Sequence, residues 1–362
     1  MPRIIVEEDR VLRLIQVILD PKASPERIAA FADYNSTDVS DFSNWLQNLR
    51  HEIPDLYPSD ITFVTSQEEL LDSLQEAEIV MVESLKIGKP QLDIATKLRL
   101  VYNFGSNTGN IDSEACLKSS IPIFTVRRRT NIAMAEHTLM FILALAKRLP
   151  LINGLLTKER LADAGFAYRQ YDTRHTAAAN FGRIPELRTL HDCTLGLLGL
   201  GEIGLEVARL ARSFGMQVLY NKRSRLSKDQ EMTLGVQYRP FDELFAQSDF
   251  LSVHVPSSEE TKNLVWENEL HQMKKGSFLI NTSRANIVNH DALVNALDSN
   301  HLAGAGCDVH YTEPVESSEP LLQHKNVILT PHLGGGSRMN GLLDAQTMLL
   351  TIQKHFELHP LQ

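Results

Sequence analysis

Short apolar runs alternate with amphipathic stretches along most of this chain, and the two patterns predict different elements. The apolar runs of the first third predict strands at 11–19, 61–64, 78–82 and 99–105. The stretches 66–77 and 91–98 carry apolar residues at helical spacing and predict helices. Strands that alternate with helices in this way are typical of βαβ units and a parallel sheet. Residues 20–60 show no periodicity that favours either element.

The alternation is stronger in the second half of the chain. Six apolar runs there predict buried strands at 194–199, 216–220, 250–255, 277–282, 303–308 and 326–330. One helix is expected at 203–214, where the apolar residues share a stripe, and another after Asn289, a favourable N-cap residue. The polar segment 155–190 is expected at the surface. Six buried strands joined by crossover helices predict a doubly wound sheet.

Composition and charge narrow the classes of protein to which the chain can belong. Its 362 residues suit two domains, and its net charge of -9 argues against a nucleic-acid or membrane-surface partner. The longest apolar stretch, 138–146, is too short to cross a bilayer. The chain has three cysteines, Cys116, Cys193 and Cys307, which are widely spaced and form no CxxC pair. This usage indicates reduced thiols in a cytoplasmic protein and no metal site.

A GxGxxG sequence at 199–204 follows an apolar strand and opens an amphipathic helix, the context that predicts a dinucleotide site. Gly199 permits a tight turn, Gly201 lets the backbone approach the pyrophosphate, and Gly204 allows the helix to pack closely on the strand. Glu202 and Ile203 lie in the first helical turn, whose N–H groups would meet the phosphates.

The next strand ends without the acidic residue that usually binds the ribose of NAD about 20 positions after the glycines. Asn221 stands there, followed by Lys222, Arg223, Ser224 and Arg225. A carboxylate would repel a 2′-phosphate, whereas these residues can bind one. We therefore predict a preference for NADP(H). The alternative is a solvated basic loop that tolerates NAD(H).

Three further stretches place reactive groups after strands of the same predicted sheet. Arg284 can hold a carboxylate bidentately and polarise a neighbouring carbonyl. His332 can deliver a proton near neutral pH, and Glu313 can orient that imidazole and stabilise its protonated form. Asp308 stands at the end of a predicted strand that lies between Arg284 and His332 in the sequence. This set suits hydride transfer to a 2-oxo acid.

Together these motifs resemble those of the D-isomer-specific 2-hydroxyacid dehydrogenases, over about residues 60–350. The motifs are the glycine loop, HVPSSEETKNLV (254–265), INTSRANIV (280–288), DVHYTEP (308–314) and PHLGG (331–335). The resemblance implies catalysis by Arg284, Glu313 and His332. It also implies that Asp308 contacts the nicotinamide amide. His254, Pro256, Thr261 and Thr282 would line the cofactor, and backbone N–H groups at Ser106 and Asn107 would hold the substrate carboxylate.

The resemblance also implies an α/β fold of two domains with a cleft that closes on the substrate. A Rossmann-type dinucleotide-binding domain would occupy 131–333. A flavodoxin-like substrate-binding domain would comprise 1–130 and 334–362, to which the last helix, 344–358, returns. The helix at 131–148 typically packs across a dimer interface, so a homodimer is expected. The chain would then reduce a small 2-oxo acid, such as glyoxylate or hydroxypyruvate, to the D-2-hydroxy acid.

Some residues depart from the family pattern. Ala285 replaces the usual glycine after the catalytic arginine, and Asn107 and Gly109 replace a glycine and an aspartate of the substrate loop. The run 127–129, three arginines at the expected hinge, could bind an anionic tail or be solvated. Formate dehydrogenase is disfavoured because Glu313 stands where such relatives carry glutamine. A dinucleotide-sensing protein that binds partners, like the C-terminal binding proteins, stays open as the alternative.

Overall fold

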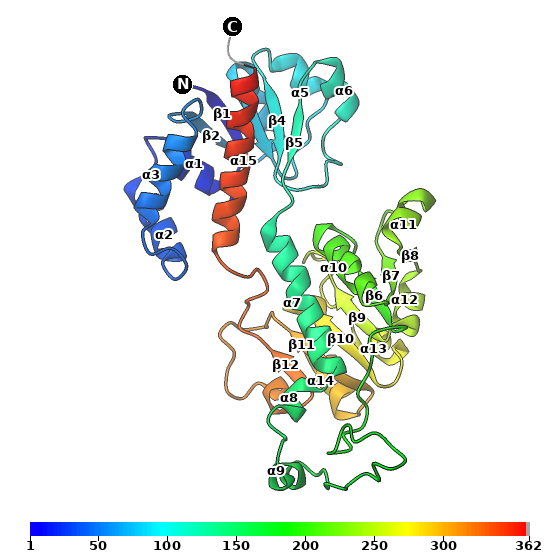
Figure 1. The fold of residues 1–362 in the computed structure, drawn as a ribbon. Helices are drawn as coiled ribbons and strands as arrows, with labels where there is room; N and C mark the ends of the chain where they lie inside the picture. Colours follow the sequence, from blue (N-terminus) through cyan, green and yellow to red (C-terminus); the bar gives the residue numbers. More distant parts are fainter. Residues whose placement is uncertain (360–362) are drawn as a thin grey trace. The chain divides into compact units, whose positions relative to one another are not determined.

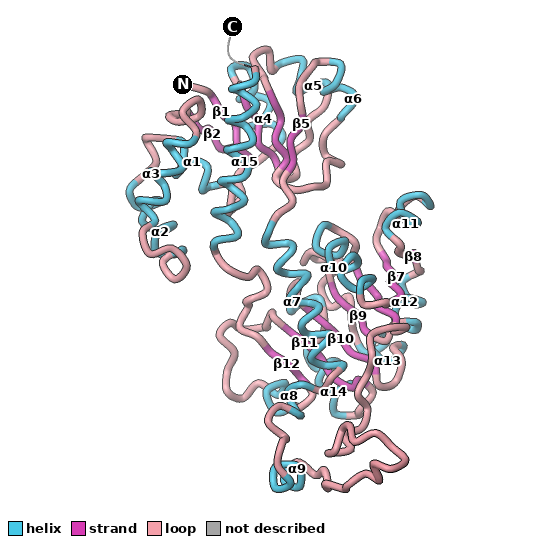
Figure 2. The backbone as a smooth tube through the Cα atoms, viewed as in Figure 1, coloured by secondary structure: helices cyan, strands magenta, loops and turns pink. Residues whose placement is uncertain are grey.

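A computed structural model describes residues 1–359, and the chain divides into two compact units. Unit 1 comprises Met1–Asn131 together with the segment that begins at Gly335, and unit 2 comprises Ile132–Gly334. Each unit is built on one parallel sheet with helices on its faces (Figures 1 and 2). The α/β class predicted from the alternating pattern is confirmed.

The sheet of unit 1 has the strand order β2-β1-β3-β4-β5. Its strands are β1 (Arg3–Glu7), β2 (Asp60–Val64), β3 (Ile79–Val82), β4 (Leu100–Asn103) and β5 (Ile123–Thr125). Its helices are α1 (Arg13–Leu19), α2 (Pro25–Asn35), α3 (Phe42–Glu52), α4 (Gln67–Ser73), η1 (Leu74–Glu76), α5 (Lys89–Ile94), α6 (Ser113–Lys118) and α15 (Met339–Leu358). This order is that of flavodoxin-like sheets, as predicted.

The prediction for the N-terminal 20 residues was wrong. The run 11–19, predicted as a strand, folds as helix α1, and the strand at this end of the chain is β1. Asp9 Oδ1 accepts hydrogen bonds from the backbone N–H groups of residues 11 and 12 (2.7 and 3.2 Å), which start the helical segment. Most side chains of α1 are buried. A helix enclosed on most sides has the same continuous apolar pattern as a buried strand.

Unit 2 has the strand order β12-β11-β10-β9-β6-β7-β8. Its strands are β6 (Thr194–Leu198), β7 (Gln217–Asn221), β8 (Gln237–Tyr238), β9 (Phe250–Val253), β10 (Ser277–Asn281), β11 (Leu302–Cys307) and β12 (Val327–Leu329). All six predicted strands are present, and β8 is an addition too short to show a period. Numbered from β6, the order is the Rossmann order with one further strand.

The helices of unit 2 precede the first strand of its sheet or lie in the connections between its strands. They are α7 (Arg129–Ala146, whose first turn belongs to unit 1), α8 (Leu149–Ile152), α9 (Lys158–Asp163), α10 (Glu202–Ser213), α11 (Lys228–Leu234), α12 (Phe241–Gln247), α13 (Glu267–Gln272), η2 (Ala285–Ile287), α14 (His290–Asp298) and η3 (Pro320–Gln323). Asn289 caps α14 as predicted, because its Oδ1 accepts from the N–H of Ala292 (3.0 Å).

Helix α7 packs on the sheet through glycines of β11. A Cβ on Gly306 would lie 2.7 Å from the ring of Phe141, and one on Gly304 would lie 3.2 Å from Leu145. Both side chains are buried in the core of unit 2. The two glycines therefore allow this helix to lie close to the strand that leads to Asp308.

Segment 155–190 has one short helix, α9, and is otherwise irregular and largely exposed, as expected.

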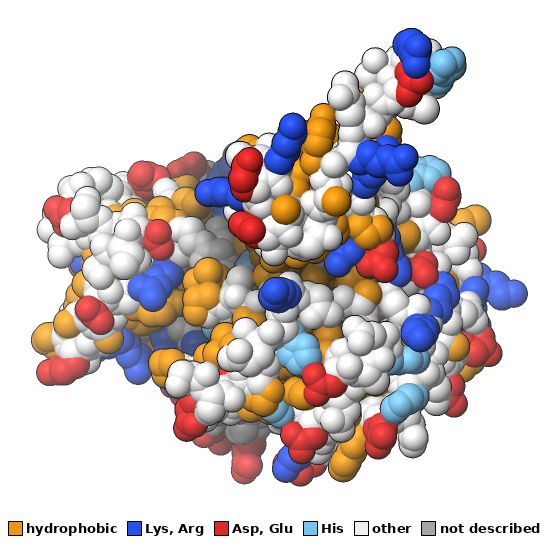
Figure 3. Space-filling model, turned by 90° about the horizontal axis from the view of Figure 1, so that it is seen from below, with side chains coloured by type: hydrophobic (Ala, Val, Ile, Leu, Met, Phe, Trp, Pro, Cys, Tyr) orange, Lys and Arg blue, Asp and Glu red, His pale blue; other side chains and the backbone are white. Residues whose placement is uncertain are grey.

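On the face drawn in Figure 3, acidic and basic side chains are interspersed rather than gathered by sign. Electrostatic selectivity there therefore depends on how individual charged groups are paired.

Candidate active site

These candidate groups of unit 2 end or follow strands at the carboxyl edge of its sheet. In the order of the strands they are His332 after β12, Asp308 after β11, Arg284 after β10, His254 after β9, the glycine loop after β6, and Asn221 at the end of β7. The strand order reverses between β9 and β6, the switch point at which dinucleotides bind in such sheets. The catalytic candidates lie on one side of that point and the ribose candidates on the other.

The glycine loop has the geometry that a pyrophosphate site requires. Gly199 has a φ of +101°, and a Cβ on it would lie 2.7 Å from the carbonyl of His254. A Cβ on Gly204 would lie 2.9 Å from the carbonyl oxygen of Gly199. A Cβ on Gly201 would meet no atom within 4 Å. Packing within the protein therefore does not require glycine at this position. Open space beside the N-terminus of α10 fits a bound diphosphate.

At the ribose end, the side chains differ in how firmly they are held. The amide of Asn221 donates a hydrogen bond to the carbonyl of Arg239 (2.8 Å). Arg223 lies 3.3 Å from Glu260, and the two side chains are 85% and 76% exposed. An ion pair this exposed is weak, so Arg223 can exchange Glu260 for another anion at little cost.

Arg225, in contrast, is held by the neighbouring helix α11. Its guanidinium donates two hydrogen bonds to Glu231 (2.8 and 2.9 Å), and they hold the pKa of that carboxyl below its usual range. A bidentate pair of this kind fixes the arginine. Lys222 is half-buried and Ser224 is exposed. Lys222, Arg223 and Ser224 are therefore better candidates for binding a phosphate than Arg225.

In the loop after β9 and at the end of β10, polar side chains make hydrogen bonds within the protein. Thr261 Oγ1 donates to the carbonyl of Pro256 (2.7 Å) and so closes that loop. Thr282 is buried, with its Oγ1 3.1 Å from that of Thr138 on α7. Burial lowers the pKa of His254 to about 4, so this ring is neutral near pH 7. It is therefore unsuited to proton transfer.

Arg284 stands on a turn that a buried asparagine holds. The amide of Asn281, 3% exposed, donates to the carbonyl of Arg284 (3.0 Å), and its oxygen accepts from the N–H of Ser283 (3.1 Å). Arg284 is exposed, and its guanidinium donates one hydrogen bond to the carbonyl of Ser283 (2.7 Å). Within the described residues it forms no ion pair, so a carboxylate ligand meets an uncompensated cation.

His332 and Glu313, which stand 19 residues apart in the chain, form a direct pair. Nδ1 of the ring lies 2.9 and 3.1 Å from the two carboxylate oxygens. The hydrogen bond from His332 lowers the pKa of Glu313, which stays ionised at neutral pH. The N–H of His310 also donates to Glu313 (3.1 Å). With Nδ1 donating to the carboxylate, Nε2 is the atom that can gain or lose a proton.

Asp308 holds the turn that carries the histidine. Its carboxylate is fully buried and accepts from Thr330 Oγ1 (2.5 Å) and from the N–H groups of Leu333 (2.7 Å) and Gly334 (2.6 Å). His137 Nε2 on α7 lies 3.4 Å away. Burial alone would raise the pKa of Asp308, but hydrogen bonds from His137, Thr330 and the backbone hold it below its usual range. The carboxylate is therefore ionised and anchors this turn.

Sequence reasoning missed four residues that position these groups: Asn281, His137, His310 and Thr330. Asn281 and His310 lie inside motifs that were singled out, and Thr330 immediately precedes another. His137 is separated from Asp308 by most of unit 2, and no local pattern relates them.

In unit 1, the predicted carboxylate-binding loop follows β4. The side-chain amide of Asn103, 1% exposed, donates to the carbonyls of Gly105 (3.1 Å) and Asn107 (3.0 Å). Gly105 has a φ of +155°, which suits glycine. Ser106 and Asn107 are exposed on this loop, and the side chain of Asn107 accepts from the N–H of Gly109 (3.1 Å). Their backbone is thus held by a buried side chain.

Comparison with known proteins places this geometry in a family. Residues 139–334 match the NAD binding domain of the D-isomer specific 2-hydroxyacid dehydrogenases. A glyoxylate reductase of Aeropyrum pernix is 35% identical over 272 residues, 75% of this chain and 77% of that protein. One from Korarchaeum cryptofilum is 32% identical over 275 residues, 75% of this chain and 77% of its own length.

The fold is shared with solved structures. The D-mandelate dehydrogenase of Rhodotorula graminis has a TM-score of 0.56 and 22% identity, over 98% of this chain and 94% of that one. The chain therefore belongs to the D-isomer specific 2-hydroxyacid dehydrogenases, and it is a nicotinamide-dependent oxidoreductase. Among the described residues, no helix is long and apolar enough to cross a membrane, and no three metal-ligating side chains cluster.

Proposed function

We propose that this protein is an NADPH-dependent reductase of small 2-oxo acids of the glyoxylate or hydroxypyruvate kind, which it converts to D-2-hydroxy acids. The observation that carries the proposal is the His332–Glu313 pair on the same sheet edge as Arg284. The relatives named glyoxylate reductase support this substrate class.

The proposed residues divide the reaction between them. Arg284 binds the carboxylate of the acid and polarises the ketone oxygen. When bound, NADPH supplies the hydride that reaches carbon 2. His332 Nε2 gives its proton to the ketone oxygen, and Glu313 stabilises the imidazolium beforehand. The product is the alcohol, and the histidine is left neutral.

The proposed cofactor contacts follow the sheet edge. The N–H groups at 201–204 bind the pyrophosphate, and Asn221, Lys222, Arg223 and Ser224 surround the 2′-phosphate. The weak Arg223–Glu260 pair supports this preference, because the arginine can turn to a phosphate. His254, Pro256, Thr261 and Thr282 line the cofactor through their backbone. Contact of Asp308 with the nicotinamide amide stays a prediction.

We further propose that unit 2 is the dinucleotide-binding domain and unit 1 the substrate-binding domain. The loop of Ser106 and Asn107 in unit 1 supports this division, since it presents backbone held by Asn103. All three cysteines are free thiols, which supports a cytoplasmic location.

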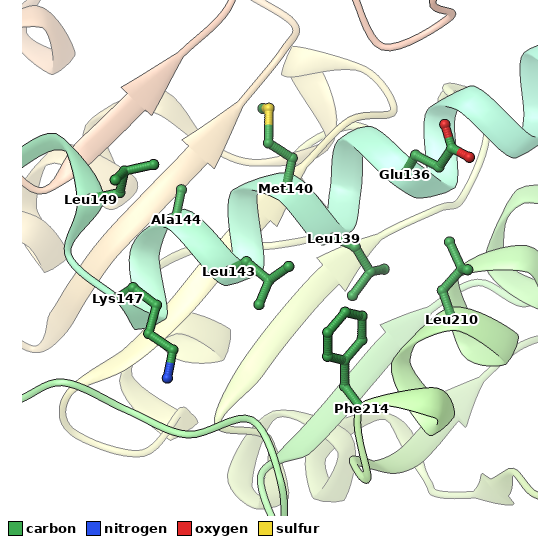
Figure 4. A pocket seen from close by; sticks show the side chains of 9 residues that line it. All are labelled: Glu136, Leu139, Met140, Leu143, Ala144, Lys147, Leu149, Leu210 and Phe214. Carbon is green, nitrogen blue, oxygen red and sulfur yellow. The ribbon is translucent and has the colours of Figure 1, made fainter. Parts of the chain in front are cut away.

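A homodimer is supported by an apolar groove on unit 2 (Figure 4). The groove has a volume of about 550 Å³ and is lined by Glu136, Leu139, Met140, Leu143, Ala144, Lys147, Leu149, Leu210 and Phe214. Met140 is 41% exposed and Phe214 is 43% exposed. Glu136 lies on α7 at one end of the groove, and Lys147 follows the last residue of α7 at the other. In a two-fold arrangement each could meet the opposite charge of a second copy.

The proposal is tested by the loss of absorbance at the nicotinamide band. The protein is mixed with a panel of 2-oxo acids, with NADPH and NADH in parallel. Turnover with NADPH well above NADH is expected. His332→Ala should lower turnover by roughly two to four orders of magnitude with little change in NADPH binding. Tight NADPH binding without turnover of any acid would favour the dinucleotide-sensing alternative.

A further inference from the structure

Two charged residues flank the substrate loop of unit 1 and have no role in the function proposed above. Strands β3 and β4 are neighbours, with Val82 opposite Asn103 in register. Glu83 therefore follows β3 beside Phe104, which follows β4 and starts the loop. Arg128 comes after the adjacent strand β5. All three lie at the carboxyl edge of this sheet.

Glu83 and Arg128 form a close ion pair packed against an aromatic ring. The guanidinium Nη1 lies 2.6 Å from the Glu83 carboxylate, and the side chains of the pair are 34% and 22% exposed. The guanidinium carbon lies 4.9 Å from the ring centroid of Phe104. The pair is thus half-buried at the base of the loop.

A further carboxylate fixes the backbone of Glu83. Glu7 Oε2, at the end of β1, accepts from the N–H groups of Glu83 (2.7 Å), Ser84 (2.9 Å) and Leu85 (2.9 Å). Burial raises the pKa of Glu83, the guanidinium of Arg128 opposes that rise, and the negative neighbours Asp9 and Glu7 add to it. The turn is therefore rigid, and the charge around Glu83 disfavours a second anion.

The chemistry of the pair favours one kind of substrate tail. A carboxylate accepts a hydrogen bond from a hydroxyl, and a guanidinium donates one to its oxygen. A methyl group in the same place would desolvate both ions without pairing them. A phosphate or carboxylate tail would be repelled by the negative charge of Glu83. The positive charge of Arg128 would not attract it, because Glu83 already neutralises that charge. Sites built to bind a hydroxyl discriminate strongly against analogues that lack it.

We propose that Glu83 and Arg128 form a subsite that selects 2-oxo acids with an uncharged, hydroxyl-bearing tail over those with an apolar or anionic tail. The inference rests on the proposed reductase function and narrows its substrate class. Hydroxypyruvate fits the subsite, whereas pyruvate and 3-phosphohydroxypyruvate do not.

The test is a ratio of kcat/KM values, measured with the full chain at saturating NADPH. Hydroxypyruvate, pyruvate and 3-phosphohydroxypyruvate are compared for the unsubstituted protein and for Glu83→Gln and Glu83→Asp. In Glu83→Gln, kcat/KM for hydroxypyruvate should fall on the order of tenfold more than that for pyruvate, because the hydroxyl loses a charged acceptor. Glu83→Asp, which keeps the charge, should restore part of the ratio.

Glu78→Gln is the matched control. Glu78 precedes the same strand β3 at its opposite end, is 22% exposed and lies 3.9 Å from Arg99. This variant should leave the ratio unchanged, which separates a subsite effect from the loss of any half-buried ion pair.

Three results would overturn the inference while leaving the proposed function intact. They are an unchanged ratio in Glu83→Gln, an equal fall for all three acids, and a preference of the unsubstituted protein for pyruvate or the phosphorylated acid. If the unsubstituted protein reduces glyoxylate but none of these acids, the inference alone fails. If it reduces neither glyoxylate nor these acids, the proposed function fails and the inference fails with it.

Discussion

Replacement of Thr330 by valine should loosen the turn that carries His332 without touching the ring or its partner Glu313. Valine has nearly the shape of threonine and lacks the hydroxyl. The Thr330 hydroxyl donates to the buried Asp308 carboxylate (2.5 Å) and lies 3.0 Å from His137 Nε2. Its loss leaves two backbone N–H groups, at 333 and 334, to hold that carboxylate.

The expected magnitude follows from the burial of the acceptor. A hydrogen bond to a charged group contributes about 1.5–3 kcal/mol. His332 has a φ of +56°, a left-handed conformation that costs roughly 1–2 kcal/mol for a residue other than glycine. Hydrogen bonds from the turn to Asp308 must offset that cost. We expect unit 2 to lose about 2 kcal/mol of unfolding free energy, and its melting temperature to fall by about 4–8 °C.

Turnover should fall as well, by roughly tenfold, because small displacements of a catalytic group are costly. The assay compares kcat and KM for glyoxylate, NADPH affinity and thermal unfolding. The folded-state pKa of Asp308 lies below 3.8, so the stability it contributes is present above that pH and is lost as the pH falls through the folded-state value. The deficit of Thr330→Val should therefore shrink in acid.

Ser299→Ala is the control for Thr330→Val. Its hydroxyl, on the residue that ends α14 of the same unit, donates to the neutral carbonyl of Asn295 (2.8 Å). This substitution should change neither turnover nor the acid dependence. Unaltered turnover in Thr330→Val, together with a stability loss no larger than that of Ser299→Ala, would refute the positioning role of Asp308.

Three further experiments test separate parts of the proposal. Glu313→Gln removes the charge that stabilises the protonated ring of His332, so the fall of reductase activity with rising pH should occur at lower pH; an unmoved profile would contradict the pairing. Arg223→Ala should weaken NADPH roughly tenfold more than NADH, whereas Arg225→Ala should not, and equal weakening by Arg223→Ala would exclude a 2′-phosphate contact. Met140→Lys places a charge in the apolar groove and should shift the dimer toward monomer in sedimentation velocity; an unchanged mass would locate the interface elsewhere.

The sequence predicted the sheet of unit 2 well because a buried parallel strand leaves a signal that depends on no other part of the chain. Each predicted strand there is a short apolar run bounded by polar residues, and Arg284 and His332 each come shortly after one, whereas Glu313 lies farther along its loop. The glycine loop was predicted for the same reason, since Gly199 and Gly204 meet atoms of their own βαβ unit or the adjacent strand.

The N-terminal segment shows where this reasoning ends. Helix α1 is enclosed by β2, α2 and α3 and by α15, which comes from the other end of the chain. Its apolar residues therefore show no exposed face, and a helix cannot be distinguished from a strand by periodicity. One of the elements that bury this helix, α15, lies more than 300 residues away in the sequence.

The basic cluster after β7 shows the same limit for a functional site. In the sequence, Arg223 and Arg225 are equivalent candidates for a phosphate. In the structure, helix α11 brings Glu231 back to Arg225, which is bound through both nitrogens, while Arg223 makes a weak and exposed contact with Glu260. The sequence shows how many basic residues are present. A ligand can bind only those whose existing ion pairs are weak enough to be replaced. Cofactor preference should therefore follow Arg223, although the sequence offers no reason to favour it over its neighbour.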